Sequence, residues 1–198
     1  MGQLPQTFRI VSFFKVAVLT ASLLALVTTS VTAQDGVIDL AGKAVDPFAV
    51  ARGKAVVLIF VRTDCPISNR YAPVIQRLSA QHVDKAEFFL IYPDKKESAE
   101  PIRKHDREFG YRIASLRDPQ HVLVKQSRAR ITPEVAVFDA DRKLIYHGRI
   151  DNLYEDFGHT RKSATTHELE DALRAAITGK ALRTDATPAV GCYISDLE

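Results

Sequence analysis

Continuous apolar runs alternate along the chain with segments in which apolar residues recur at helical spacing. Residues 56–61 are all apolar, and residues 86–93, AEFFLIYP, are apolar except for Glu87. Apolar runs without alternation are typical of strands that are covered on both faces, as in a parallel sheet. The pattern therefore predicts buried β-strands over 56–61 and 86–93.

Helical spacing predicts a helix on either side of the second strand. The first covers 69–82 and contains Pro73, which should kink it because proline lacks an amide proton and crowds the preceding turn. The second covers 98–109 and is closed by Gly110.

The second half of the chain predicts a helix followed by a β-hairpin. Asp118 should cap the helix and Pro119 should take its first position, with the helix continuing to about residue 127. Strand 134–138, the turn DADR and strand 143–150 then make the hairpin.

The remaining segments complete the expected fold. Two short apolar pieces predict a hairpin over 37–50 at the domain edge. Thr165 and Glu168 form a capping box before the last helix, which Gly179 ends, and 181–198 is expected to be an extended tail. This order predicts an α/β sandwich about a mixed central sheet.

Residues 1–33 carry the features of an export signal. Arg9 and Lys15 precede an apolar stretch of 12 residues, 16–27. A small-x-small pattern then ends at Ala33. Twelve apolar residues are too few to span a bilayer, which takes about 20. The sequence predicts cleavage near Ala33 and a periplasmic or secreted protein, with a retained membrane anchor as the alternative.

The charge left after this segment is close to neutral. The chain has 27 Lys and Arg against 24 Asp and Glu, so loss of Arg9 and Lys15 leaves 25 against 24. This near-neutral charge gives no indication of a nucleic-acid partner. Residues 34–180 are long enough for one domain with its own core, followed by the tail.

One of the two cysteines, Cys65, stands where the first buried strand gives way to a helix. There, unpaired N–H groups and the positive end of the helix dipole favour a thiolate, and Pro66 fits the first helical position. Arg62 and Arg70 should lower the thiol pKa further, while Asp64 opposes them. The pattern predicts a reactive thiol that lies open at the helix start, against the alternative of a small buried apolar residue.

Cys65, Pro73 eight residues on, and the later stretch ARITPEVAVFDADRKLIYHGRI resemble the thioredoxin-like superfamily, in its exported redoxin branch with AhpC/TSA and TlpA-like proteins. The resemblance implies a three-layer α/β sandwich and a thiol–disulfide oxidoreductase or peroxiredoxin-like antioxidant protein. It implies partners that are protein thiols or disulfides, or a small oxidant, and it implies no cofactor and no metal. Thr132–Pro133 would be the cis bond beside the active cysteine, with backbone exposed for a substrate strand.

Two further residues complete the predicted site. Arg130 would lie near Cys65 and steady a thiolate or sulfenate. Cys192, 127 residues beyond Cys65, could resolve an oxidised Cys65 as a disulfide if the tail folds back, with Gly191 allowing a close approach. An oxidising compartment outside the cytoplasm permits such a pair.

The sequence departs from the motifs of the known branches. Ser68 stands where Cys-x-x-Cys has its second cysteine. Leu58 and Arg62 stand where typical peroxiredoxins have a proline and a hydroxyl residue, and Asn69 stands where Sco-type copper proteins have a second cysteine.

Two alternatives therefore stay open. In a Sco-like copper carrier, both cysteines and one histidine among His147, His159 and His167 would hold Cu(I), which favours sulfur and imidazole. In a degenerate redoxin, a bond between the two cysteines would be purely structural.

Overall fold

The apolar runs form the centre of a six-stranded mixed sheet in the computed structural model, which describes residues 1–2, 36–182, 184–195 and 197. Ala55–Phe60 (β2), buried at every position, pairs in parallel with Ala86–Tyr92 (β3) and antiparallel with Glu134–Phe138 (β6). The strand order is β1-β4-β3-β2-β6-β7, in which the others are Ile38–Asp39 (β1), Ala114–Arg117 (β4) and Leu144–Gly148 (β7). The predicted buried strands and mixed sheet are confirmed.

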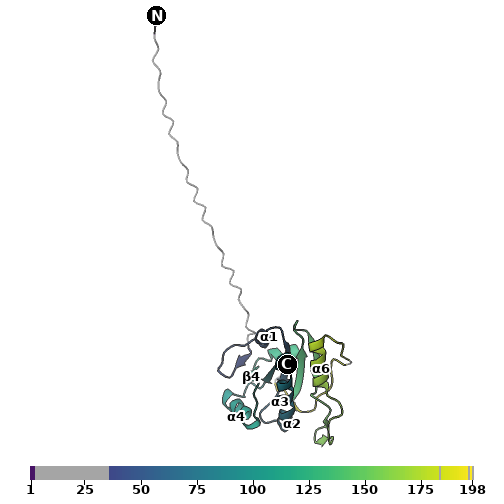
Figure 1. Cartoon of the computed structure of the whole chain (residues 1–198). Coiled ribbons are helices and arrows are strands. Elements are labelled where there is room, and N and C mark those ends of the chain that lie inside the picture. The colour runs from purple at the N-terminus through teal and green to yellow at the C-terminus, as the bar shows by residue number, and fades with distance from the viewer. Residues whose placement is uncertain (3–35, 183, 196, 198) are drawn as a thin grey trace. The chain divides into compact units, whose positions relative to one another are not determined.

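Helices cover both faces of this sheet (Figure 1). The helices of the described residues are Pro47–Ala51 (α1), Pro66–Arg70 (α2), Ala72–Gln81 (α3), Ala99–Phe109 (α4), Val122–Ser127 (α5) and Glu168–Thr178 (α6). One face packs against α3, α4 and α6 through Ile75, Ile102 and Leu173. The other packs against α1 and α5 through Phe48 and Leu123. This is the expected three-layer sandwich.

Every helix and strand described here lies in the unit Thr32–Glu198. The predicted signal segment falls almost wholly outside the described residues, so cleavage near Ala33 stays a prediction. Among the residues described, no helix is long and apolar enough to cross a membrane.

The predicted kinked helix over 69–82 is instead the end of one helix and the whole of another. The chain leaves α2 at Tyr71, and Pro73 lies in the first turn of α3. A proline there costs no hydrogen bond, because the first amides of a helix have no partner within it. Pro73 therefore starts a helix rather than kinking one.

Two predicted helix starts were wrong. The helix begins at Val122 with His121 as its cap residue, and the Asp118 carboxylate accepts from the amides of Val122 (2.8 Å) and Val124 (2.9 Å) from outside the helix. The capping box at Thr165 does not form, because the last helix starts after His167.

The predicted hairpin over 37–50 is also shorter than expected. Its arms meet only at Ile38 and Ala44. The second apolar piece becomes α1, whose cap is Asp46, because this carboxylate accepts from the amide of Phe48 at 2.9 Å. Strand β4, with the sequence ASLR, was not predicted, because it has no apolar pattern of its own.

The C-terminal tail is extended as expected, and it returns across the fold at two places. At residues 185–187, here called the tail anchor, the His147 amide donates to the Asp185 carbonyl (2.9 Å). At residues 192–194, here called the tail strand, Cys192–Tyr193 (β10) pairs antiparallel with Ile131–Thr132 (β5). The tail strand thus lies directly on the segment before Pro133.

Candidate functional site

Cys65 lies at the amino end of α2, beyond the carboxyl end of β2. It is the cap residue, with Pro66 at the start of the helix, and its carbonyl accepts from the Asn69 amide (3.1 Å). This placement confirms the sequence prediction. The prediction that the thiol lies open is wrong, because Cys65 is 0% exposed.

The cover over Cys65 is polar and comes from the tail strand and the segment it pairs with. Cys65 Sγ donates to the Thr132 carbonyl at 3.2 Å, and Cys192 Sγ donates to Cys65 Sγ at 3.1 Å. Both cysteines are free thiols. Because a disulfide has an S–S length of about 2.05 Å, the sulfurs need to approach by only about 1 Å to bond. The fold therefore brings together two sulfurs that are 127 residues apart in sequence.

The two thiols have opposite pKa shifts. Burial raises the pKa of Cys65. Hydrogen-bond donors of Ser68 and Cys192 lower it by more, so the pKa of Cys65 lies below its ordinary value. Burial also raises the pKa of Cys192, and its bond to Cys65 and the Cys65 charge bring it to about 11. Cys65 is therefore the member of the pair that ionises first.

Ser68 explains how a short helix can favour the Cys65 thiolate. Its amide belongs to the third residue of α2, which is where a cap side chain finds hydrogen-bond donors. The Ser68 hydroxyl is fully buried and makes no hydrogen bond among the described residues. The residue at the missing second cysteine of Cys-x-x-Cys thus places an amide and an unengaged hydroxyl beside Cys65, and both lower the pKa of its thiol.

The nearby arginines act differently from the prediction. Arg62 pairs with Asp64 (3.0 Å) and Asp94 (3.9 Å), and its charge lowers the pKa of Cys192, where burial is the larger influence in the opposite direction. Arg70 is exposed at the end of α2.

Thr132 lies beside the Cys65 sulfur, and the Thr132–Pro133 bond is cis, as predicted. Thr132 is buried, and its hydroxyl donates to the Cys192 carbonyl (3.2 Å). The backbone that was predicted to be exposed for a substrate strand is instead paired with the tail strand.

Arg130 contributes to this segment through its backbone. Its amide donates to the Glu134 carboxylate (2.8 Å), and its carbonyl accepts from the Ile194 amide (2.9 Å). Its exposed side chain lines a cavity of about 480 Å³ with His147 and tail residues around Pro188. No contact between its guanidinium and either sulfur is found among the described residues.

Gly191 permits the close approach of the tail strand. A Cβ atom at this position would lie 2.1 Å from the Thr132 carbonyl oxygen. Real Cβ atoms do not approach oxygen so closely, so only glycine fits without a shift of backbone.

Residues 28–147, which are 120 of the 198, match the AhpC/TSA family. The chain belongs to the AhpC/TSA family. Membership places it among the thioredoxin-like redoxins and supports a thiol–disulfide oxidoreductase or peroxiredoxin-like activity.

Solved structures share the fold of this AhpC/TSA protein. A hypothetical protein from Sinorhizobium meliloti 1021 has a TM-score of 0.69 and 22% identity, covering 80% of this chain and 88% of that one. An uncharacterized conserved protein from Geobacillus kaustophilus has a TM-score of 0.67 and 23% identity, covering 80% and 86%. A secreted disulfide oxidoreductase from Mycobacterium tuberculosis, homologous to E. coli DsbE, has a TM-score of 0.50 and 19% identity, covering 70% and 92%. A search of curated proteins finds no match to the chain.

A polar network that the sequence analysis missed holds the loop before Cys65. The amide and hydroxyl of Thr63 donate to the Glu97 carboxylate, and the Asn69 side chain donates to the Thr63 carbonyl (3.2 Å). His105 Nε2 donates to Asn69 Oδ1 (2.7 Å). No sequence pattern links these residues, because the network depends on how α4 packs beside α2.

The histidines of the copper alternative do not join the sulfurs. His147 Nδ1 lies 3.5 Å from the Glu134 carboxylate, and His159 and His167 are exposed on β9 (His159–Thr160) and before α6. Within the described part of the chain, no three His, Cys, Asp or Glu side chains come together as metal ligands.

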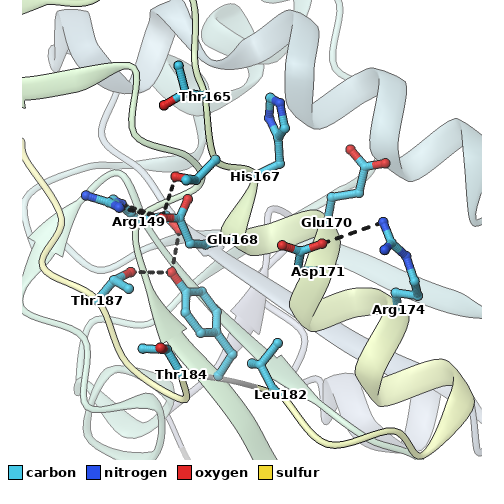
Figure 2. A pocket seen from close by; sticks show the side chains of 12 residues that line it. Arg149, Thr165, His167, Glu168, Glu170, Asp171, Arg174, Leu182, Thr184 and Thr187 are labelled. Carbon is cyan, nitrogen blue, oxygen red and sulfur yellow. Dashed lines mark hydrogen bonds and ion pairs between the residues drawn. The ribbon is translucent and has the colours of Figure 1, made fainter.

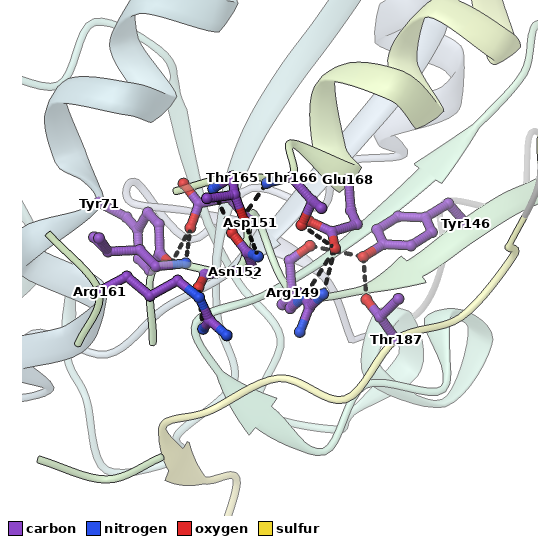
Figure 3. A network of polar contacts seen from close by, with 11 residues as sticks. Tyr71, Tyr146, Arg149, Asp151, Asn152, Arg161, Thr165, Thr166, Glu168 and Thr187 are labelled. Carbon is purple, nitrogen blue, oxygen red and sulfur yellow. Dashed lines mark hydrogen bonds and ion pairs between the residues drawn. The ribbon is translucent and has the colours of Figure 1, made fainter. Parts of the chain in front are cut away.

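Polar contacts hold the tail anchor against β7. The Tyr146 hydroxyl donates to the Arg149 carbonyl (2.7 Å) and bonds the hydroxyl of Thr187. Figure 3 shows this contact beside the ion pair of Arg149 and Glu168. A cavity of about 510 Å³ opens here (Figure 2), lined by neither cysteine, and its polar side chains largely pair with one another. The network therefore supports the tail rather than offering a second redox site.

Proposed function

We propose that this AhpC/TSA protein is an exported thiol–disulfide oxidoreductase in which Cys65 and Cys192 interconvert between a dithiol and a disulfide. The observation that carries the proposal is the 3.1 Å distance between their sulfurs. The chain has two cysteines in all, so each is the other's only possible partner within one molecule.

The pKa shifts favour one direction of exchange. Burial opposes the Cys65 thiolate, but Ser68 and Cys192 stabilise it, and its pKa is lowered. A stabilised thiolate stabilises the reduced protein, which makes the disulfide a stronger oxidant. The protein is therefore proposed to donate its disulfide to substrate thiols: two thiols of the substrate become a disulfide, and the protein pair takes up the two electrons as a dithiol.

Peroxide reduction receives less support from the same geometry. The position that carries a hydroxyl in typical peroxiredoxins is Arg62, which is engaged with Asp64 and Asp94. The neighbouring hydroxyl of Thr63 is engaged with Glu97. Neither is free to hold a peroxide beside Cys65, so disulfide exchange is the preferred activity.

Export is proposed on the signal-like character of residues 1–33. The M. tuberculosis protein of the same fold is secreted, which agrees with this location. The proposed partners are thiols of exported proteins, because an extracytoplasmic compartment is where disulfides form and persist.

Redox titration and variants test the proposal. The reduced protein is equilibrated in glutathione buffers of graded potential, its intramolecular disulfide is read by mass spectrometry, and oxidation of a reduced dithiol peptide is assayed in parallel. Wild type should form the Cys65–Cys192 bond reversibly and oxidise the peptide, while Cys65→Ser and Cys192→Ser should do neither. Ser68→Ala serves as the control that keeps both sulfurs and should retain the bond.

Two outcomes contradict the proposal. If no bond between Cys65 and Cys192 forms at any potential, the pair is not a redox centre. If the bond forms but resists dithiothreitol in the native protein, and Cys65→Ser lowers the melting temperature with no activity to lose, the bond is a structural staple.

A further inference from the structure

We propose that a substrate thiolate attacks Cys192 rather than Cys65, so that the mixed disulfide is carried by the tail strand. This inference rests on the proposed function and reverses the roles expected from the sequence, in which Cys65 attacks and Cys192 resolves. It assigns the substrate-facing sulfur to a residue outside the segment that matches the family.

Access to the two sulfurs is the first argument. Thiol–disulfide exchange proceeds by attack of one thiolate on one sulfur, and the accessible sulfur reacts faster. Cys65 is 0% exposed, with the Thr132 carbonyl and Cys192 against its sulfur. Cys192 is partly exposed, and the next residue, Tyr193, is 77% exposed. An incoming thiolate therefore reaches Cys192 from solvent, while Cys65 lies behind it.

The leaving group is the second argument. Attack on Cys192 expels Cys65 as a thiolate, next to the amide and hydroxyl of Ser68. Attack on Cys65 would expel Cys192, whose pKa burial and Cys65 raise to about 11. The thiol with the lower pKa leaves faster. Access and leaving group thus select the same sulfur.

The backbone pairing is the third argument. The backbone at Thr132–Pro133 was expected to pair with a substrate strand, but β10 already pairs with Ile131–Thr132. The Ile194 amide also donates a hydrogen bond to the Arg130 carbonyl. While the tail strand is in place, a substrate can meet only the outer side of this strand, beside Tyr193.

The atoms and electrons of the step balance as follows. The substrate thiolate forms a new bond to Cys192 Sγ, the bond between Cys192 and Cys65 breaks, and its electron pair stays on Cys65. A second thiolate of the substrate then attacks the substrate sulfur in the mixed disulfide. The substrate leaves as a disulfide, and Cys192 departs and takes up a proton.

The site of attack can be read directly in wild-type protein. The protein is oxidised to the Cys65–Cys192 disulfide and mixed with reduced glutathione as the probe. Samples are quenched in acid at early times, unfolded, and treated with a maleimide at mildly acidic pH to block the freed cysteine. Peptide mapping then locates glutathione on one cysteine and maleimide on the other.

The expected result is glutathione mainly on Cys192 and maleimide on Cys65, with at least a tenfold preference at the earliest times. Glutathione mainly on Cys65, or equally on both, would overturn the inference while leaving the redox pair intact. Failure to form the disulfide at all would instead overturn the proposed function, so the two failures are distinguishable.

A second variant checks that the cover decides the site of attack. Gly191→Ala places a Cβ against the Thr132 carbonyl oxygen and should loosen the tail strand over Cys65. Glutathione should then appear on Cys65 in a larger share than in wild type. Gly158→Ala is the control for a glycine replacement without a clash, because Gly158 has nothing within 4 Å of its added Cβ; its φ of +90° confines the strain of the alanine to the turn between β8 (Tyr154–Asp156) and β9. An unchanged distribution in Gly191→Ala would show that burial under the tail strand does not select the sulfur.

Discussion

Replacement of Gly191 by alanine should expose Cys65 in the reduced protein. The added Cβ would lie 2.1 Å from the Thr132 carbonyl oxygen and 2.7 Å from its carbonyl carbon. Both are backbone atoms in β5, so neither can swing aside as a side chain would. Forcing extra atoms into a packed contact costs about 1–3 kcal/mol.

That cost can be compared with what holds the tail strand closed. The strand is held by the backbone pairing of β10 with β5 and by hydrogen bonds from the Ile194 amide to the Arg130 carbonyl and from the Thr132 hydroxyl to the Cys192 carbonyl, at about 1 kcal/mol each. Ile194 is 5% exposed, and burial of such a side chain contributes about 1.5–3 kcal/mol. The strand therefore stays mostly closed in the variant, but its open fraction should rise about 5- to 150-fold, since 1.4 kcal/mol is a factor of ten.

The assay is the rate of alkylation of Cys65 by iodoacetamide in the reduced protein, followed by peptide mass spectrometry. A buried thiol reacts through its open state, so the rate follows the open fraction. Gly158→Ala controls for the same chemical change in an exposed loop. If Cys65 in Gly191→Ala reacts no faster than in this control, the tail strand is not what shields the thiol.

Three further predictions follow from the site. Ser68→Ala should raise the Cys65 pKa, because burial then meets fewer opposing hydrogens, and the ultraviolet absorbance of the thiolate against pH measures this; an unchanged pKa would remove Ser68 from the account. Burial lowers the pKa of His105, so the folded protein binds a proton at this residue less readily than the unfolded chain does. The free energy of unfolding should therefore fall as the pH drops below the unfolded pKa of about 6.5, by at most about 1.4 kcal/mol per pH unit. Urea unfolding of His105→Gln should therefore depend less on pH in this range than wild type, and parallel curves would contradict the assignment. Replacement of His147, His159 or His167 by alanine should leave the Cu(I) affinity of the reduced protein unchanged, because none of these histidines joins Cys65 and Cys192 in the described chain, and a clear loss of affinity in one of the three variants would restore the copper-carrier alternative.

The elements that were predicted correctly are those whose signal is local. Strand β2 is apolar at every position because both its faces are covered, and Cys65 follows it just before a proline that suits a helix start. Strand β4 was missed because ASLR is ordered by pairing with β3 and β1 rather than by its own pattern.

The parts of the site that sequence could not supply depend on long-range contacts. The cover over Cys65 comes from a strand 127 residues later, and its position depends on the path of the whole tail. Gly191 was a hint of close approach, but sequence could not show which surface it approaches. Ser68 was interpreted only as an absent cysteine, since its effect on the thiolate requires a hydroxyl buried beside the sulfur.

The relocation of the second cysteine to the tail changes what oxidation does to the site. In Cys-x-x-Cys the second sulfur is fixed one helical turn from the first, so both redox states present the same surface. Here the disulfide would tie the tail strand covalently over Cys65, whereas in the dithiol the same strand is held by its backbone pairing with β5, by further hydrogen bonds and by the burial of Ile194. Cys65 should therefore be uncovered far more readily after reduction than in the disulfide, which couples access to Cys65 to redox state.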